Sequence, residues 1–120
     1  MRNEDDLKDL ILEIAAEVEE AMDMGWMTIT HKFSTRLDDD RITATAVSDW
    51  MYRQGTVIWN LAMVATMEDD RIQATLVHEL VHMLTACLWE SLPDKVKDDV
   101  HSLNELATEN VTRAILALMP

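Results

Sequence analysis

Glycine and proline, the residues that most readily turn a chain, are scarce in this sequence, which has two of each among 120 residues. All-β folds with many turns need more of both. Apolar residues make up 48% of the chain and charged residues 28%, which is the balance of a folded globular protein rather than a disordered one. We therefore expect one domain, spanning residues 1–120, with few long loops.

The charge of the chain argues against several classes of partner. Ten Lys and Arg stand against 23 Asp and Glu, which gives a net charge of −13. Because nucleic acids and anionic membranes attract cationic surfaces, we expect neither as a partner. Residues 1–10 lack the pattern of a signal peptide, and Cys87 has no second cysteine with which to form an internal disulfide. These features favour a cytosolic protein.

Hydrophobic periodicity predicts an α+β protein with the order α-β-β-β-α-α. Helical spacing of apolar residues covers 4–23, 68–91 and 93–118, and alternation covers 26–33, 41–47 and 56–64. Asp38–Asp40 is expected to form a turn between the first two strands. Because short connections favour antiparallel neighbours, we expect a small, mainly antiparallel sheet that packs on helix 68–91.

Residues 78–82 have the sequence His-Glu-Leu-Val-His, an H-E-x-x-H motif inside predicted helix 68–91. Residues four apart lie on one helix face, so His78 and His82 can share a tetrahedral Zn²⁺ ion. Glu79 is rotated off their line and can transfer protons near the metal without binding it. The apolar residues of this helix occupy the opposite half of its circumference, which argues against two histidines held only by core packing.

Two glutamates on the last predicted helix compete to be the third protein ligand that such a zinc site needs. Glu105 and Glu109 are four residues apart and share one helix face. Both point away from an apolar stripe that we expect to face the core, consisting of Val100, Leu103, Ala107, Val111, Ala114 and Leu118. Helical spacing does not choose between them. One can bind the metal while the other supports a histidine N–H.

The motif together with a later glutamate resembles the zincin metallopeptidases of the gluzincin type, the group that includes thermolysin. Asn104-Glu105, with Glu109 four residues on, is similar to the N-E-x-x-x-D pattern of thermolysin-like enzymes, and this implies Glu105 as the ligand. The whole chain resembles small zincin-like metallopeptidases of bacteriophages and bacterial mobile elements more closely. Their motifs match residues 76–82 and 109–115, which implies Glu109 instead. We take Glu105 as the ligand and keep Glu109 as the alternative.

These resemblances imply a minimal zincin-like fold and a zinc-dependent peptidase, with Glu79 as general base and then general acid. They also imply that strand 56–64 presents its edge to an extended peptide or protein substrate. His101, one turn before Glu105, is the preferred candidate for polarising the carbonyl oxygen in the transition state. His31, Tyr52 and Arg113 are the other residues considered for that role.

Two further function classes remain open from the sequence. The first is a non-catalytic protein that keeps a zinc-bearing zincin scaffold and uses it to bind other proteins. The second is an acidic protein that mimics nucleic acid, which the net charge of −13 suggests. A mimic needs no stoichiometric zinc, and a scaffold needs no Glu79, so both can be separated from the peptidase by experiment.

Overall fold

A computed structural model of the chain describes residues 2–35 and 41–119 and confirms the α+β class. The elements are α1 (Glu4–Ala21), β1 (Thr28–Ser34), β2 (Ala44–Asp49), the short 3-10 helix η1 (Trp50–Tyr52), β3 (Gln54–Asn60), α2 (Leu61–Val64), α3 (Asp69–Glu90) and α4 (Asp94–Leu118). The three long helices begin and end within a few residues of the predicted bounds, whereas the predicted turn at Asp38–Asp40 lies outside the described residues. Within the described ranges, no helix combines the length and apolarity needed to cross a membrane.

The sheet is mixed, so the prediction of a mainly antiparallel sheet is wrong. β3 lies between the other two strands, parallel to β1 and antiparallel to β2. Only β2 and β3, which are joined through η1, follow the rule that a short connection gives antiparallel neighbours. Side-chain alternation is the same in parallel and antiparallel strands, so the sequence pattern did not reveal that β1 pairs with β3.

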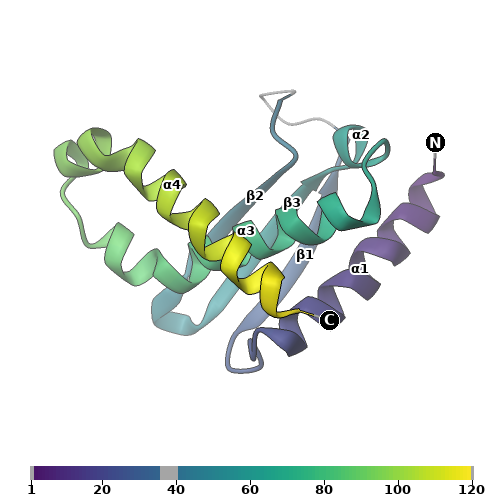
Figure 1. The fold of residues 1–120 in the computed structure, drawn as a ribbon, viewed down its shortest axis with the longest axis horizontal. Coiled ribbons are helices and arrows are strands. Elements are labelled where there is room, and N and C mark those ends of the chain that lie inside the picture. The colour runs from purple at the N-terminus through teal and green to yellow at the C-terminus, as the bar shows by residue number, and fades with distance from the viewer. Residues whose placement is uncertain (1, 36–40, 120) are drawn as a thin grey trace.

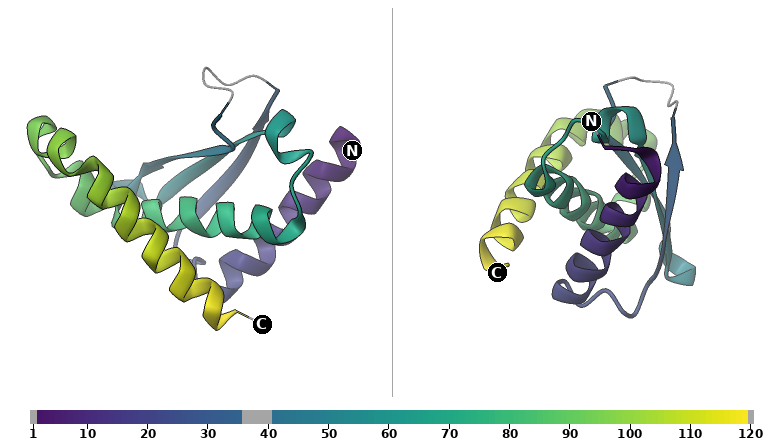
Figure 2. Two further views of the ribbon diagram at one scale, coloured as in Figure 1. Left: turned by 45° about the horizontal axis from the view of Figure 1, so that its top comes forward. Right: turned by 90° about the vertical axis from the view of Figure 1, so that its right-hand side faces the viewer.

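Helices α1 and α3 cover one face of the sheet, and α4 lies across α3 (Figures 1 and 2). The C-terminal end of α4 approaches that of α1, where Ala21, Met22, Ile115 and Leu118 line one pocket. The core between the sheet and the two helices contains the buried residues Leu7, Ile11, Val57, Trp59, Ile72, Leu76, Leu80 and Val81. At Gly55 on β3, an added Cβ would lie 2.6 Å from the Met83 sulfur on α3. This glycine therefore leaves room for the end of the Met83 side chain beneath the sheet.

The packing of α4 differs from the expectation, because its apolar stripe faces solvent. Thr108 and Thr112 are buried instead, and each hydroxyl donates a hydrogen bond to the carbonyl four residues earlier, at 2.8 and 2.7 Å. Their polar groups are thus satisfied within the helix, so buried threonines incur little desolvation penalty. On the stripe, Leu103 is 64% exposed and Leu118 is 86% exposed. Helix amphipathicity alone therefore predicted the wrong face.

Candidate metal centre

The two histidines of the H-E-x-x-H motif lie one turn apart on the face of α3 that is turned away from the core. The Nε2 atoms of His78 and His82 are 3.1 Å apart, and the side chains are 18% and 23% exposed. Their position follows from the sequence, because buried residues such as Leu76 and Leu80 hold the opposite side of α3 against the sheet. Both rings therefore border a cleft in which their nitrogens can bind a ligand.

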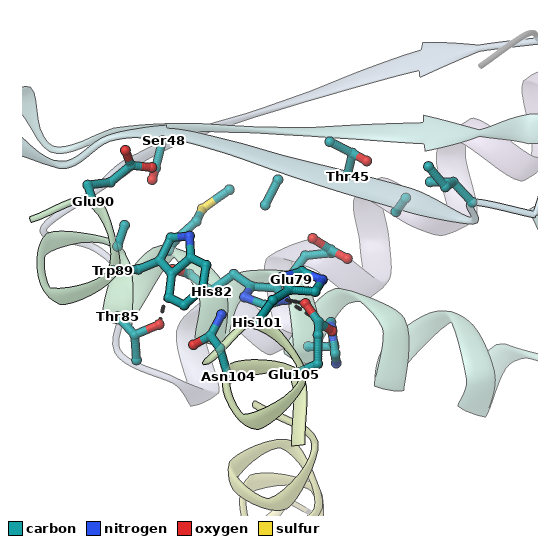
Figure 3. Close-up of a pocket in the computed structure, with 16 residues that line it drawn as sticks. Thr45, Ser48, Glu79, His82, Thr85, Trp89, Glu90, His101, Asn104 and Glu105 are labelled. Atoms are coloured by element: carbon teal, nitrogen blue, oxygen red, sulfur yellow. Dashed lines mark hydrogen bonds and ion pairs between the residues drawn. The ribbon is translucent and has the colours of Figure 1, made fainter. Parts of the chain in front are cut away.

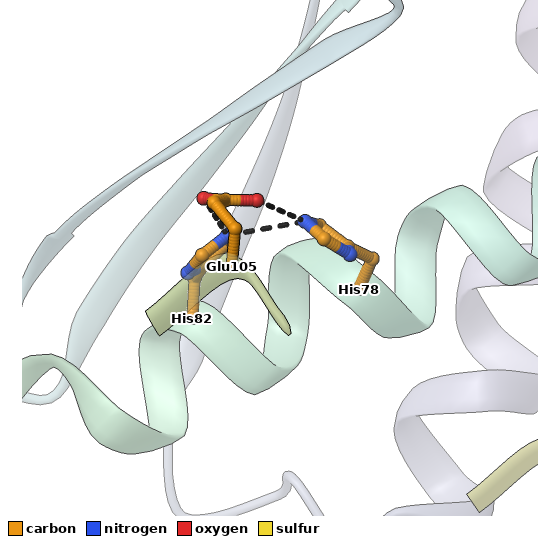
Figure 4. Close-up of side chains that lie close together, drawn as sticks. All are labelled: His78, His82 and Glu105. Atoms are coloured by element: carbon orange, nitrogen blue, oxygen red, sulfur yellow. Dashed lines mark hydrogen bonds and ion pairs between the residues drawn. The ribbon is translucent and has the colours of Figure 1, made fainter. Parts of the chain in front are cut away.

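Glu105 of α4 meets both histidines, and Figure 4 shows its carboxylate lying across their ring nitrogens. One carboxylate oxygen is 3.2 Å from Nε2 of His82, and the other is 3.4 Å from Nε2 of His78. For zinc–ligand distances of about 2.0 to 2.1 Å, the ligands of a tetrahedral site lie about 3.3 Å apart. The three side chains, with one potential ligand atom each within 4.8 Å of the others, therefore fit a metal ion of this size.

Glu109 lies on the other side of the same histidine. Its Oε1 atom is 2.5 Å from Nδ1 of His78, whereas Glu105 is close to Nε2. The two glutamates that the sequence left as competitors thus occupy different positions around one imidazole ring. Glu105 belongs to the group that can hold a metal, whereas Glu109 makes an ion-pair contact with Nδ1, a buried nitrogen that has no hydrogen-bond partner among the described residues.

Glu79 borders the same cleft and is directed towards β2 (Figure 3). Burial raises the pKa of Glu79 from its ordinary value of 4.5 to about 7. The charge of His78 and a hydrogen bond from the backbone N–H of Ala46 act in the opposite direction, while Glu105 raises the pKa further. A carboxyl group that titrates near neutral pH can both accept and release a proton under ordinary conditions.

The pKa of His82 is lowered, chiefly because burial disfavours the charged imidazolium. The positive charges of His78 and His101 lower it further, and the nearby Glu105 carboxylate partly opposes the shift. A neutral imidazole keeps a lone pair on one nitrogen, which is the form that binds a metal ion. Burial thus favours the protonation state that a metal site requires.

The cleft continues into a hollow on each side of the histidines. The first hollow, of about 620 Å³, extends past Ser48, Trp89, His101 and Asn104. The second, of about 650 Å³, extends past Arg41, Thr75, Arg71, Thr112 and Arg113. Residues of the β2 segment line both hollows, whereas β3 is the central strand. The expectation that strand 56–64 presents its edge to the site is therefore wrong, and β2 occupies that position.

The structure separates the four candidates for polarising a carbonyl oxygen. His101 lines the first hollow beside Trp89, with ring centroids 6.2 Å apart. Arg113 lines the second hollow. His31 instead accepts a hydrogen bond from the Trp59 indole in the core and does not line either hollow. Tyr52 is exposed in η1.

Ala46 contributes to the site through its backbone N–H, which carries no side-chain signal in the sequence and so could not be predicted from it. Arg71 was also overlooked, although a signal was present. It lies seven residues before His78, and that spacing corresponds to two turns of one helix face. The spacing of charged residues around the motif therefore held more information than the motif alone.

Comparisons of the chain with protein-family models, with curated proteins and with solved structures found no match.

Proposed function

We propose that the protein is a zinc-dependent peptidase of the zincin type, with His78, His82 and Glu105 as the metal ligands. The observation that carries the proposal is the convergence of these three side chains in a cleft that also contains Glu79. Two imidazoles and a carboxylate suit zinc, and three protein ligands leave one position open. When bound in such a site, zinc lowers the pKa of water towards neutrality and polarises a carbonyl oxygen.

In this mechanism Glu79 carries out the proton transfers. It accepts a proton from the attacking water and then delivers that proton to the leaving amine. Its pKa of about 7, raised by burial, supports this role because the group exchanges protons readily near neutral pH. The Ala46 N–H of β2 favours the charged form of this carboxylate, so a backbone group of β2 supports the base.

Glu109 acts by orienting His78 rather than by binding the metal. A carboxylate 2.5 Å from Nδ1 favours the tautomer that carries its proton on Nδ1. The Nε2 lone pair of His78 is then available on the side that faces His82 and Glu105. This assignment supports Glu105 as the third ligand and gives Glu109 a separate role.

The substrate in this proposal is an extended peptide that adds to the edge of β2. Among the described strands, β2 pairs only with β3, so its other edge, apart from the Ala46 N–H that faces Glu79, has backbone groups available for a further strand. An added peptide would pass along both hollows and past the histidines. His101, which lines the first hollow, remains the candidate for stabilising the carbonyl oxygen in the transition state.

Zinc content and turnover, measured together in wild type and Glu79→Gln, test the proposal. We expect about one zinc per chain in both proteins. Turnover of a broad peptide library should fall roughly a hundredfold or more in Glu79→Gln, the usual scale for a positioned base. Glu90→Gln is the matched control, because Glu90 lines the first hollow but is exposed and has no part in the mechanism.

Each outcome of this experiment has a distinct meaning. Equal cleavage by wild type and Glu79→Gln would remove Glu79 from the mechanism. Stoichiometric zinc without cleavage by either protein would favour the non-catalytic scaffold that binds other proteins. Absence of zinc from the wild type, or its retention in both His78→Ala and His82→Ala, would disprove the metal site.

Zinc affinity distinguishes the roles of the two glutamates. Glu105→Ala should lose most of the zinc affinity, because one of three protein ligands is removed. In Glu109→Ala the zinc affinity should fall by only about 10- to 100-fold, because Glu109 affects the metal through the orientation of His78. Competition with a chromogenic chelator measures both variants, and the reverse ranking would make Glu109 the ligand.

A further inference from the structure

Positive charge is concentrated on one side of the candidate metal centre. The second hollow is lined by Arg41, Arg71 and Arg113, which are half of the six arginines in a chain whose net charge is −13. They come from three segments: the residues before β2, the first turn of α3 and the second half of α4. The fold thus gathers dispersed cations into one region beside the histidines.

Arg71 and Arg113 do not form ion pairs with any residue in the described ranges. Glu109 lies one turn before Arg113 on α4, where it could pair with it, but its carboxylate is directed to His78 instead. A guanidinium group presents a planar set of donors that matches a carboxylate. Two guanidinium groups that have no ion-pair partner within residues 2–35 and 41–119, in one hollow of such an acidic chain, therefore favour an anionic ligand.

The acidic groups that border the second hollow are already engaged at its histidine end. Glu105 contacts both histidines, Glu109 contacts Nδ1 of His78, and Glu79 accepts a hydrogen bond from a backbone N–H. The two ends of the hollow thus differ in charge. A carboxylate ligand would be attracted to the arginine end and would lie apart from the three acids.

The arginines are far enough from the histidines to contact a different part of the same peptide. Arg71 precedes His78 by seven residues, which corresponds to about 10 Å along α3, and Arg113 follows Glu105 by eight residues, or about 12 Å along α4. The two helices run in opposite directions (Figure 1), so both arginines reach the same end of the cleft. An extended peptide covers this distance with about three residues.

The direction of β2 indicates which part of the peptide reaches the arginines. β2 begins at Ala44, which lines the second hollow, and continues to Ser48, which lines only the first. A peptide paired antiparallel to β2 would run the opposite way, with its C-terminal part in the second hollow. Antiparallel pairing is the more stable arrangement for an added strand.

We propose that the second hollow is a carboxylate-binding subsite in which Arg71 and Arg113 bind the peptide substrate, two or three residues C-terminal to the cleaved bond. The ligand is a carboxylate with two possible sources, the C-terminus of a short peptide or an Asp or Glu side chain. This inference rests on the proposed peptidase function for its substrate class. The charge and position of the arginines carry it independently of turnover.

A binding measurement tests the subsite without depending on hydrolysis. Glu79→Gln protein is titrated against N-terminally fluorescein-labelled hexapeptides, Ala-Ala-Phe-Leu-Ala-Ala and Ala-Ala-Phe-Leu-Glu-Ala, each with a free or an amidated C-terminus. Fluorescence anisotropy at low salt should show at least about tenfold tighter binding when a carboxylate is present. The amidated peptide with Glu reports the side chain as the source, and the Ala peptide with a free C-terminus reports the terminal carboxylate.

The same titration with Arg71→Gln and Arg113→Gln shows whether these two arginines cause the tighter binding of carboxylate peptides. Either substitution should reduce the preference for the carboxylate peptides severalfold and leave binding of the neutral amide unchanged. Arg53→Gln is the matched control, because Arg53 is an exposed arginine at the opposite end of β2, beyond η1. All three positions are exposed, so the folded structure should persist in each variant.

The outcomes separate this inference from the proposed function. Equal affinity for carboxylate and amide peptides, no binding by any of them, or a preference unchanged in both arginine variants would overturn the subsite. Peptide cleavage without a carboxylate preference would overturn the subsite alone. A preference lost in the arginine variants, in a protein that neither binds zinc nor cleaves peptides, would keep the subsite and disprove the peptidase.

Discussion

Helices α3 and α4 both contribute side chains to the candidate metal centre, but they are attached to the rest of the protein in different ways. α3 buries Ile72, Leu76, Val77, Leu80 and Val81 beneath the sheet. α4 turns two threonines towards α3 and leaves its apolar stripe in solvent. The comparison shows that one half of the site rests on the core, while the other half depends on a small interface.

The contacts of α4 explain why its attachment should be the weaker one. Apart from its two threonines, the residues of α4 that pack against the core cluster are Ile115 and Leu116, both near its C-terminal end. A buried Leu or Ile contributes about 1.5 to 3 kcal/mol, and α3 has several of these where α4 has none fully buried. The attachment of α4 should therefore depend more than that of α3 on groups that link the two helices. These groups include any metal held by His78, His82 and Glu105.

The largest change in the free energy of unfolding is expected for substitutions on the core side of α3. Leu80→Ala should lower the free energy of unfolding by about 3 kcal/mol, because it removes a fully buried side chain and leaves a cavity. Leu88→Ala, on the same helix but 71% exposed, is the matched control and should change it by less than about 1 kcal/mol. Urea denaturation measures both, and similar losses would contradict the packing of α3.

Removing the metal should affect α4 more than α3. If zinc joins the two helices, a free concentration a hundred times the Kd stabilises the fold by about 2.7 kcal/mol. Chelation should then speed amide hydrogen exchange in α4, while the core-facing amides of α3 change less. Exchange measured with zinc and with a chelator tests this, and equal acceleration in the two helices would show that α4 is not attached more weakly.

The metal-free protein should also show a pH dependence that originates at Glu79. Its pKa of about 7 in the folded protein exceeds the ordinary value of 4.5, so the folded state holds this proton more tightly than the unfolded state. Stability present below pH 4.5 is therefore lost as the pH rises from 4.5 through 7. Glu79→Gln does not titrate, and well above pH 7 it should be more stable than wild type by about 3 kcal/mol.

Denaturation at pH 4 and pH 8, in the presence of a chelator, measures this difference. The advantage of Glu79→Gln should be small at pH 4 and fully present at pH 8. Glu90→Gln again serves as the control, since its carboxylate is exposed. A constant difference between wild type and Glu79→Gln at both pH values would mean that burial of Glu79 does not penalise its charged form.

The same comparison explains how much of the protein was predictable from sequence. The class, the three long helices and the shared face of His78 and His82 follow from local periodicity, which the structure confirms. The pairing of β1 with β3 and the position of β2 beside the cleft depend on strand order, which alternation does not encode. The separate positions of Glu105 and Glu109 around His78 required the packing of α4 on α3.

The apolar face of α4 was predicted wrongly for a physical reason. Helical periodicity assumes that the more apolar face is buried, and on α4 that face is the exposed stripe. The buried face carries threonines, whose hydroxyls bond within the helix and whose small size permits a close approach to α3. The contacts of the glutamates with the histidines require this same face to turn inward.

The smallest change in the free energy of unfolding is therefore expected for substitutions on the apolar stripe of α4. Helical periodicity, which predicts that this stripe is buried, would instead predict a large change there. Leu103→Ala and Val111→Ala should each change the free energy of unfolding by less than about 0.5 kcal/mol, since Leu103 is 64% and Val111 45% exposed. The same substitution at a leucine buried in a core lowers the free energy of unfolding by about 2 to 5 kcal/mol. Urea denaturation at several protein concentrations measures the change. A loss above about 2 kcal/mol at every concentration would mean that the stripe is covered within the single chain. In that case α4 would be held by its apolar face, as α3 is, and the contrast between the two halves of the site would disappear.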